Sequence, residues 1–435
     1  MNKKNGWQSN GENLVKSAYV QNTGTLTKMN FSYTTEQTDF VEEVRTWLEE
    51  HIKGDFSALR GKGLTGHDDV DPQLQIAWEK ELATGGWLGI DFPEWIGGRE
   101  CSLVEQVLFH KTYVEARAPG RIPNMGVTLL GPTLLSFGSK AQQERFIPRI
   151  LSGEELWCQG YSEPDAGSDL SNIKTSAELV DGLWVINGQK VWTSLAQYAD
   201  WIFVIARTEE GSQRHAGLSY LLVPMAQLEI TIRPIIQLTG GAEFNETFFD
   251  NAKTHKEHVV GEQGNGWAVA MGTLAFERGA STLGQQISFR QELDDLLHAA
   301  KSNESWEDPV IRQKLMDSYI GLEILRFNQL RMLTALATEK IPGAEQSIGK
   351  LYWASWHRNL GELWMEIRGS SGMVAQYQGH GGHEGIPYVL DKGQRTFLYS
   401  RAHTIYGGSN QVQRNIIGER ILGLPKEPKP RLEFG

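Results

Sequence analysis

The 435-residue sequence has few or none of several features that would by themselves assign the protein to a class. Its two cysteines, Cys101 and Cys158, are too few for a disulfide framework, which favours a reducing compartment, the cytoplasm. No apolar run reaches the roughly 18 residues of a membrane-spanning helix. Lys and Arg number 42 against 53 Asp and Glu, and the resulting net charge of −11 argues against a nucleic-acid partner.

The sequence pattern changes several times along the chain. Residues 1–30 are polar and predict a disordered tail. Apolar residues at every fourth position from about residue 35, an Asp71-Pro72 helix start and a Gly85-Gly86 stop predict helices. β-Branched and aromatic runs then predict a β domain, after which the helical period returns. We therefore expect an α+β protein with an N-terminal helical domain (31–155), a middle β domain (156–262), a C-terminal helical domain (263–425) and a tail (426–435).

One segment of the β region carries both a turn signal and candidate ligand contacts. The stretch "LWVINGQKVWTS" (183–194) alternates across Asn187-Gly188, a dipeptide favoured in two-residue hairpin turns, and so predicts a hairpin. Trp192 on its second strand is either a core residue or the flank of a flat heteroaromatic ring. In the second case the neighbouring hydroxyls would hydrogen-bond the polar edge of that ring.

Two glycine-containing turns could hold an anionic ligand. "GYSEPDAGSDLSN" (160–172) combines hydroxyls with small residues, as phosphate-binding loops do, but a solvated loop with Asx and Ser turns would look the same. "HTIYGGSNQVQRN" (403–415) bends at two glycines and starts a helix, whose N-terminus favours negative charge. This second turn contains no carboxylate and no cysteine, and its one histidine precedes the bend.

A fourth segment, "TLAFERGAS" (273–281), places Glu277 beside Arg278 on an otherwise apolar helix, where a surface ion pair is the alternative reading. The motifs "YSEPDAGSD", "KVWTS", "FERG" and "IYGGSNQVQRN" occur in this order within a helix–β–helix layout. From residue 35 to about 425 the chain therefore resembles the acyl-CoA dehydrogenase family.

The resemblance implies a fold, a cofactor and a reaction. It implies a β-barrel-like middle domain, a C-terminal four-helix bundle, and FAD bound between them. Family members oxidise an acyl-CoA to its trans-2-enoyl-CoA: a carboxylate removes the α-proton while the β-hydrogen leaves as hydride to the flavin. By position, the resemblance assigns FAD contacts to Tyr161, Ser162, Gly167, Ser168, Trp192, Thr193, Ser194, Gly369, Ser409, Asn410 and Gln411. It assigns substrate contacts to Ser168, Phe276, Arg278, Tyr406 and Gly407.

The catalytic base is displaced relative to much of the family. The terminal turn commonly reads "IYEGT" with Glu as base, and here that position is Gly407. A minority of members places the base just before an Arg on the helix after the β domain, which is Glu277 here. Gly407 retains the backbone N–H that polarises the thioester carbonyl. In the family a base on that helix accompanies branched or bulky acyl groups. The glycine pair removes side-chain volume, although it also satisfies positive φ in a turn.

Other departures keep alternatives open. The Arg-x-Phe-Gly segment that helps bind FAD of a neighbouring subunit is missing between 284 and 312, and "EIRGSSG" has Glu366 and Ser370 where the family has Gln and Gly. Either the adenosine site is built differently or a partner subunit supplies it. The chain could thus be an active dehydrogenase, a non-catalytic or half-site subunit of a hetero-oligomer, or a flavoprotein that oxidises a non-CoA substrate. The retained motifs favour the first.

The resemblance also suggests a homotetramer or heterotetramer and an electron-transferring flavoprotein as electron acceptor. His380 and His383 lie among glycines that supply no further ligands, so we expect a flexible loop there and no metal.

Overall fold

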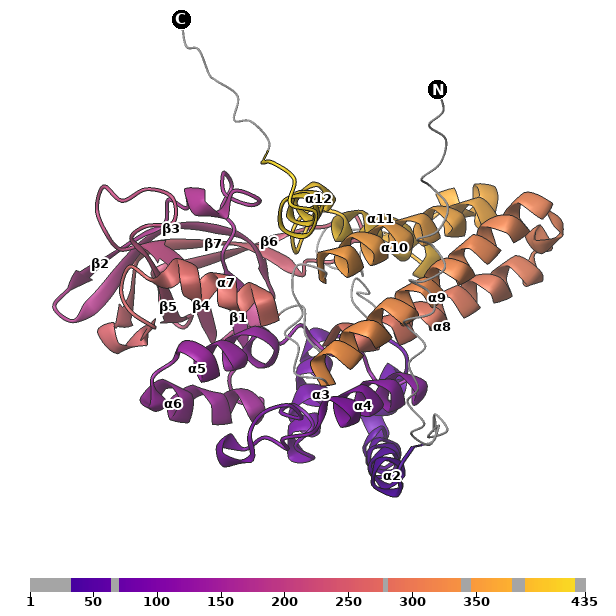
Figure 1. Cartoon of the computed structure of the whole chain (residues 1–435), viewed down its shortest axis with the longest axis horizontal. Helices are drawn as coiled ribbons and strands as arrows, with labels where there is room; N and C mark the ends of the chain where they lie inside the picture. The colour runs from indigo at the N-terminus through magenta and orange to yellow at the C-terminus, as the bar shows by residue number, and fades with distance from the viewer. Residues whose placement is uncertain (1–32, 64–69, 277–280, 338–345, 378–387, 427–435) are drawn as a thin grey trace, which may run out of the picture. The chain divides into compact units, whose positions relative to one another are not determined.

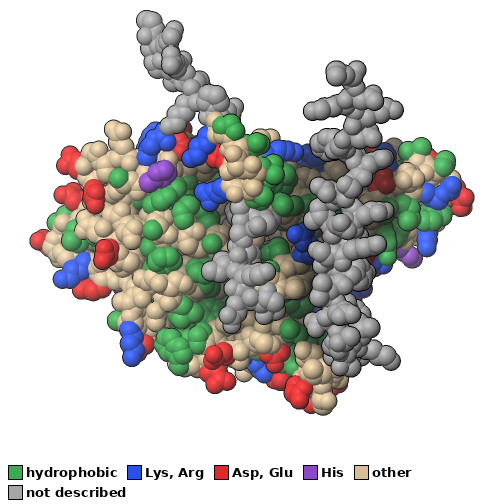
Figure 2. All heavy atoms as spheres, viewed as in Figure 1, with side chains coloured by type: hydrophobic (Ala, Val, Ile, Leu, Met, Phe, Trp, Pro, Cys, Tyr) green, Lys and Arg blue, Asp and Glu red, His purple; other side chains and the backbone are tan. Residues whose placement is uncertain are grey.

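The computed structural model describes residues 33–63, 70–276, 281–337, 346–377 and 388–426 (Figure 1). Several predicted features lie outside these residues: the N-terminal tail, Glu277 with Arg278, the two loop histidines, and most of the C-terminal tail. None of the described helices is both long and apolar enough to cross a bilayer. In Figure 2 acidic and basic side chains are interspersed over the visible face.

The first part of the chain is helical, as its apolar period predicts. Its helices are α2 (Thr35–His51), α3 (Pro72–Thr84), α4 (Leu103–Glu115), α5 (Gly131–Phe137) and α6 (Lys140–Leu151). The expected limits of α3 are confirmed, because the Asp71 side chain accepts a hydrogen bond from the Gln73 N–H at 2.9 Å and Gly85 follows the last helical residue. Val44, Leu48 and Trp78 are buried in one core.

The middle part is a mixed β-sheet. Its strands are β1 (Trp157–Gly160), β2 (Ser176–Val180), β3 (Leu183–Ser194), β4 (Trp201–Arg207), β5 (Leu218–Pro224), β6 (Ile230–Ile235), β7 (Phe244–His255) and β8 (Val259–Val260). The hydrogen-bonded order is β6-β7-β3-β2-β4-β5-β8, and β1 pairs with β4 in parallel. Cys158 on β1 is fully buried, and this burial raises the pKa of its thiol, as expected for a structural cysteine.

The hairpin expected at Asn187-Gly188 is wrong. Both residues lie inside β3, which runs without a turn from Leu183 to Ser194 and pairs with β7 through a register shift at this point. The hairpin turn is instead at Asp181-Gly182, between β2 and β3, where both residues have positive φ (51° and 80°). At Gly188 φ is 148°, outside the range of a type I′ turn. The register shift here skips a residue of β7: Ile186 pairs with Ala252 and Asn187 with Asp250, which leaves Asn251 between them with a φ of 59°.

The last part returns to helices: α7 (Gly266–Phe276), α8 (Ser281–Ser302), α9 (Pro309–Ala337), α10 (Gln346–Arg368), α11 (Lys392–His403) and α12 (Asn410–Ile416). Helices α8, α9, α10 and α11 pack on one another in that series, which fits the expected bundle (Figure 1). The apolar faces of α8, α9 and α10 share a core that includes Leu293, Leu322 and Leu360. A short ladder pairs β9 (Gln376–Tyr377) with β10 (Tyr388–Val389). The fold is thus the predicted succession of helical, β and helical parts.

Candidate functional site

A buried ion pair fixes the loop that follows β1. The Glu163 carboxylate accepts hydrogen bonds from Lys190 Nζ at 2.8 Å and from the backbone N–H groups of Lys174 at 2.7 Å and Thr175 at 3.0 Å. Burial lowers the pKa of Lys190 to about 8, against the opposing effect of Glu163. Burial alone would raise the pKa of Glu163, but Lys190 and the N–H donors outweigh it and hold that pKa below its usual value. The pair is ionised at neutral pH.

The same loop is tied to β3 through its backbone. Lys190 Nζ also donates to the carbonyl of Tyr161 at 3.1 Å, and the Val191 N–H donates to the carbonyl of Ser162 at 2.9 Å. Beyond these anchors Gly167 and Ser168 are exposed, and a Cβ added to Gly167 would meet no atom within 4 Å. The loop therefore presents an open backbone beside a rigid strand, which suits close approach of a phosphate.

Trp192 leaves the sheet at a bulge in β3. The pairing with β7 shifts register between Lys190 and Thr193, and Trp192 takes a φ of 61°. Its side chain is 58% exposed and meets Phe244 edge to face. The adjacent Thr193 is fully buried, and its hydroxyl makes no hydrogen bond with any described residue. The exposed ring of Trp192 thus lies next in sequence to a buried hydroxyl that has no hydrogen-bond partner among the described residues.

The C-terminal turn follows α11 and has the predicted form. Gly407 and Gly408 have φ values of 62° and 84°. The Ser409 hydroxyl then caps α12 by accepting a hydrogen bond from the Val412 N–H at 3.2 Å. Asn410 is buried and Gln411 is exposed. The turn thus leads into the N-terminus of α12, which carries a partial positive charge.

Glu243 connects the end of β3 with the helix that leads into this turn. Its carbonyl accepts a hydrogen bond from the Leu195 N–H at 2.8 Å, and its carboxylate accepts one from the Tyr399 hydroxyl at 3.4 Å. The hydrogen bonds of Lys190 and Val191 thus join the loop at 160–172 to β3, and Glu243 joins the residue after β3 to α11, the helix that precedes the C-terminal turn. Of the motif "FERG", Phe276 ends α7 and is partly buried, while Glu277 and Arg278 lie outside the described residues.

Gly369 stands apart from this group. It begins a short 3-10 turn after α10, has a φ of 55° and is exposed, and within the described residues no hydrogen bond joins it to the other predicted cofactor residues. In the same "EIRGSSG" segment Glu366 pairs with Lys314 at 2.6 Å, and the assignment of Gly369 to the cofactor stays a prediction.

A cavity of about 510 Å³ opens beside the C-terminal turn, within the usual size range of ligand pockets. Its walls come from the loops at 61–63 and 117–121, the end of α4, the start of α8, and the facing parts of α9 and α10. Tyr406 and Gly407 also line it. The cavity has more ionisable side chains in its wall than a site for hydrocarbon alone would have: Arg117, Arg121, Glu292, Lys350, His357 and His403.

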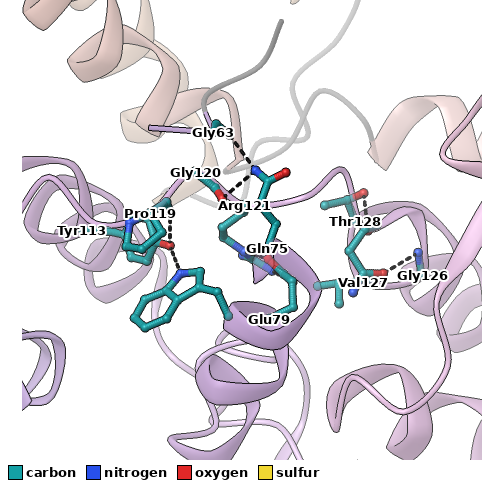
Figure 3. A network of polar contacts seen from close by, with 12 residues as sticks. Gly63, Gln75, Glu79, Tyr113, Pro119, Gly120, Arg121, Gly126, Val127 and Thr128 are labelled. Carbon is teal, nitrogen blue, oxygen red and sulfur yellow. Dashed lines mark hydrogen bonds and ion pairs between the residues drawn. The ribbon is translucent and has the colours of Figure 1, made fainter. Parts of the chain in front are cut away.

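The wall contributed by the N-terminal helices is a hydrogen-bonded network (Figure 3). Arg121 binds the buried Glu79 carboxylate through two N–H groups, at 2.8 and 2.9 Å. Tyr113 accepts from the Trp78 indole N–H and donates to the Pro119 carbonyl, both at 2.6 Å. Because these groups are saturated by one another, this wall is rigid.

The opposite wall contains a second buried network, which the sequence did not single out apart from His403. His357 Nε2 lies 2.7 Å from a Glu292 carboxylate oxygen, and His357 Nδ1 lies 2.9 Å from His403 Nδ1. Burial is the main cause that lowers the pKa of His403 well below its usual value; His357 and Lys350 add to this effect, and Glu292 opposes it. Helical periodicity in the sequence could have indicated this network. Glu292 and His357 occupy positions on the apolar faces of their helices, four and three residues, respectively, from buried leucines.

Comparison with known proteins places this site in a family. The family models for the acyl-CoA dehydrogenase N-terminal, middle and C-terminal domains match residues 34–154, 158–252 and 264–422. The chain belongs to the acyl-CoA dehydrogenase family. It is accordingly an oxidoreductase that acts on acyl-CoA thioesters, and members of the family are FAD flavoproteins.

Similar proteins include several acyl-CoA dehydrogenases. The acyl-CoA dehydrogenase IpdE1 of Mycobacterium tuberculosis is 51% identical over 391 residues, covering 90% of this chain and 98% of the relative. Human mitochondrial short-chain specific acyl-CoA dehydrogenase is 27% identical, covering 81% and 84%. Among solved structures, the Tcur3481-Tcur3483 steroid ACAD is 26% identical with a TM-score of 0.77, covering 92% of this chain and 100% of that one.

The described residues fit FAD. The open backbone at Gly167, the exposed Trp192 ring and the unbonded buried hydroxyl of Thr193 are the features that a phosphate and a flat, polar-edged ring require. The N-terminus of α12, which Ser409 caps, also favours negative charge.

Proposed function

We propose that the protein catalyses FAD-dependent α,β-dehydrogenation of a branched or bulky acyl-CoA, with Glu277 as the base that removes the α-proton. The observation that carries this proposal is Gly407, which lines the cavity without a carboxylate. An α-proton of a thioester is only weakly acidic, so a carboxylate must come from elsewhere. In the sequence, Glu277 directly follows Phe276, the last residue of α7.

Different residues of the chain would bind the cofactor, polarise the thioester and bind the CoA part of the substrate. Tyr161, Ser162, Ser168, Trp192, Thr193 and Ser409 would hold FAD, which when bound accepts the β-hydrogen as hydride. The Gly407 N–H would donate to the thioester carbonyl, which lowers the free energy of the enolate-like transition state. Arg278 would neutralise charge on the CoA side.

The preference for a bulky acyl group is supported by the cavity and by the relatives. A cavity of about 510 Å³ beside a glycine pair has room for a branched or cyclic acyl group. One similar structure is described as a steroid ACAD, and another is the ChsE4-ChsE5 complex, which shares the fold. Both names join two components, which supports the second candidate, a subunit of a hetero-oligomeric dehydrogenase. An electron-transferring flavoprotein remains the expected acceptor, and the cytoplasm the expected compartment.

The test is anaerobic bleaching of the flavin absorbance by straight-chain, branched and cyclic acyl-CoAs. We expect the wild type to bleach with the branched or cyclic class. Glu277→Gln should bind flavin but bleach at least about a hundredfold more slowly, since a positioned general base contributes factors of roughly 10² to 10⁴. Glu262→Gln, at an exposed carboxylate just before α7, is the matched control and should bleach normally.

Two results would change the assignment. A Glu277→Gln protein that bleaches as fast as the wild type would exclude Glu277 as the base. A purified chain that stays colourless with added FAD would favour the half-site subunit over the complete enzyme.

A further inference from the structure

Three buried side chains form a hydrogen-bonded chain that ends at the cavity. Glu292 on α8, His357 on α10 and His403 at the end of α11 are 7%, 6% and 4% exposed, and all three line the cavity. The contacts measure 2.7 Å from the Glu292 oxygen to His357 Nε2 and 2.9 Å from His357 Nδ1 to His403 Nδ1. No step of the proposed dehydrogenation uses these residues.

The chain fixes how His403 can interact with a ligand. The Glu292 carboxylate accepts the Nε2–H of His357, and the contact between the two Nδ1 atoms contains one proton. If His403 donates that proton, its Nε2 is an acceptor. If His357 donates it, the Nε2 of His403 carries a hydrogen and is a donor. Either way one defined polar atom remains, and no hydrogen bond within the described part of the chain engages it.

The surroundings hold the His403 ring in place. Its backbone carbonyl accepts a hydrogen bond from Lys350 Nζ at 2.5 Å. The rings of Trp353, Tyr399 and Tyr406 contact it edge to face. A hydrocarbon acyl group against this wall would leave the ring nitrogen buried without a partner, which costs about 1–3 kcal/mol.

We propose that His403 Nε2 hydrogen-bonds an oxygen function, a hydroxyl or a ketone, on the acyl group of the substrate. Glu292 and His357 are the positioning residues that set the proton on the His403 ring. The inference rests on the proposed dehydrogenation and narrows its substrate to an oxygenated bulky acyl-CoA. His403 can serve both oxygen functions. With both histidines neutral, His403 donates from Nδ1 to His357, and its Nε2 accepts from a hydroxyl. When the pair takes up one further proton from solvent, His357 carries hydrogens on both nitrogens beside the Glu292 carboxylate, and the Nε2–H of His403 donates to a ketone.

The experiment compares cyclohexylpropanoyl-CoA with the same thioester bearing a ring hydroxyl or a ring ketone. Binding to the flavoprotein is measured by calorimetry and turnover by flavin bleaching. We expect the wild type to prefer at least one oxygenated thioester by about a hundredfold or more in kcat/KM, and to bind it at least about tenfold more tightly, since sites built around a substrate hydrogen bond reject analogues that lack it.

His403→Phe keeps the ring and removes both nitrogens, so it should reduce the preference to within about tenfold while the plain thioester still binds. Glu292→Gln should weaken the preference for the oxygenated thioester and shift the pH dependence of that preference, because Glu292 acts on the His403 ring through His357. The other polar groups that face His403 are Lys350, Tyr399 and Tyr406. His403→Asn, which retains a polar group, should recover part of the preference.

Two outcomes overturn the inference: a wild type that binds all three thioesters equally, or a His403→Phe variant with an undiminished preference. Preferential binding without bleaching by any thioester would instead support the inference and contradict the proposed dehydrogenation.

Discussion

At the scale of single residues, Trp192 shows strain at the place where function is expected. A tryptophan with a φ of 61° and a 58% exposed side chain gains little from packing, and a left-handed backbone costs a bulky residue about 1–2 kcal/mol. Strain of this kind persists at sites where ligand contact requires it. Asp181 has a similar φ of 51°, but lies in the β2–β3 turn, where left-handed residues are ordinary.

Replacing Trp192 by Gly should separate folding from flavin binding. Relief of the backbone strain offsets the lost contact with Phe244, so the free energy of unfolding without flavin should stay within about 1 kcal/mol of the wild type. The Kd for FAD should rise at least about tenfold, because the ring contact is lost. The control, Asp181→Gly, should leave the Kd unchanged. Equal affinity in both variants would show that Trp192 does not contact the flavin; flavin fluorescence titration measures both.

At the scale of elements, α10 supplies both core and cavity. Leu360 and Leu363 are buried in the helical core, whereas Gly349, Lys350 and His357 face the cavity. Gly349 has no positive φ that would require glycine, and a Cβ added there would meet no atom within 4 Å. Glycine is a poor helix former, so its use in the interior of α10 indicates that the space it leaves is used.

Gly349→Leu should therefore narrow the cavity without destabilising α10. We expect the melting temperature to stay equal or rise, since leucine favours helix over glycine by roughly 0.5–1 kcal/mol. For cyclohexylpropanoyl-CoA, kcat/KM should fall about tenfold or more, while butanoyl-CoA should be little affected. Gly349→Ala gives the graded control. A uniform loss with both thioesters would indicate a distorted site rather than a smaller one.

At the scale of the whole molecule, α9 carries apolar side chains that the described residues leave exposed. Met316, Ile320, Ile324 and Phe327 recur at helical spacing and are 43–56% exposed. An apolar helix stripe of this length is typical of a subunit interface. It suits the expected tetramer, with a second acyl-CoA dehydrogenase chain as the partner.

A charge in this stripe should weaken assembly. Ile320→Asp combined with Ile324→Asp should lower the molecular mass found by light scattering to that of a smaller oligomer, because two carboxylates would be buried without partners. Leu228→Asp, at a fully exposed leucine outside α9, should leave the mass unchanged. An unchanged mass in the double variant would place the interface elsewhere.

The sequence alone determined the features that depend on neighbouring residues. The capped start of α3, the succession of helical, β and helical parts and the glycine turn before α12 are set by local period, capping and backbone freedom, and the order of four short motifs led to the family. Glu277, the predicted base, lies outside the described residues and stays a prediction.

Tertiary structure decided what depends on pairing between distant segments. Asn187-Gly188 has the local signal of a hairpin, yet Asn187 pairs with β2 on one side and with β7 on the other. The dipeptide therefore stays inside β3, and the turn formed at Asp181-Gly182. Glu292, His357 and His403 come from three separate helices, and no local pattern records that their side chains meet. Burial supplies the reason: away from water each polar group needs a partner, and only the packed fold determines which distant group that partner is.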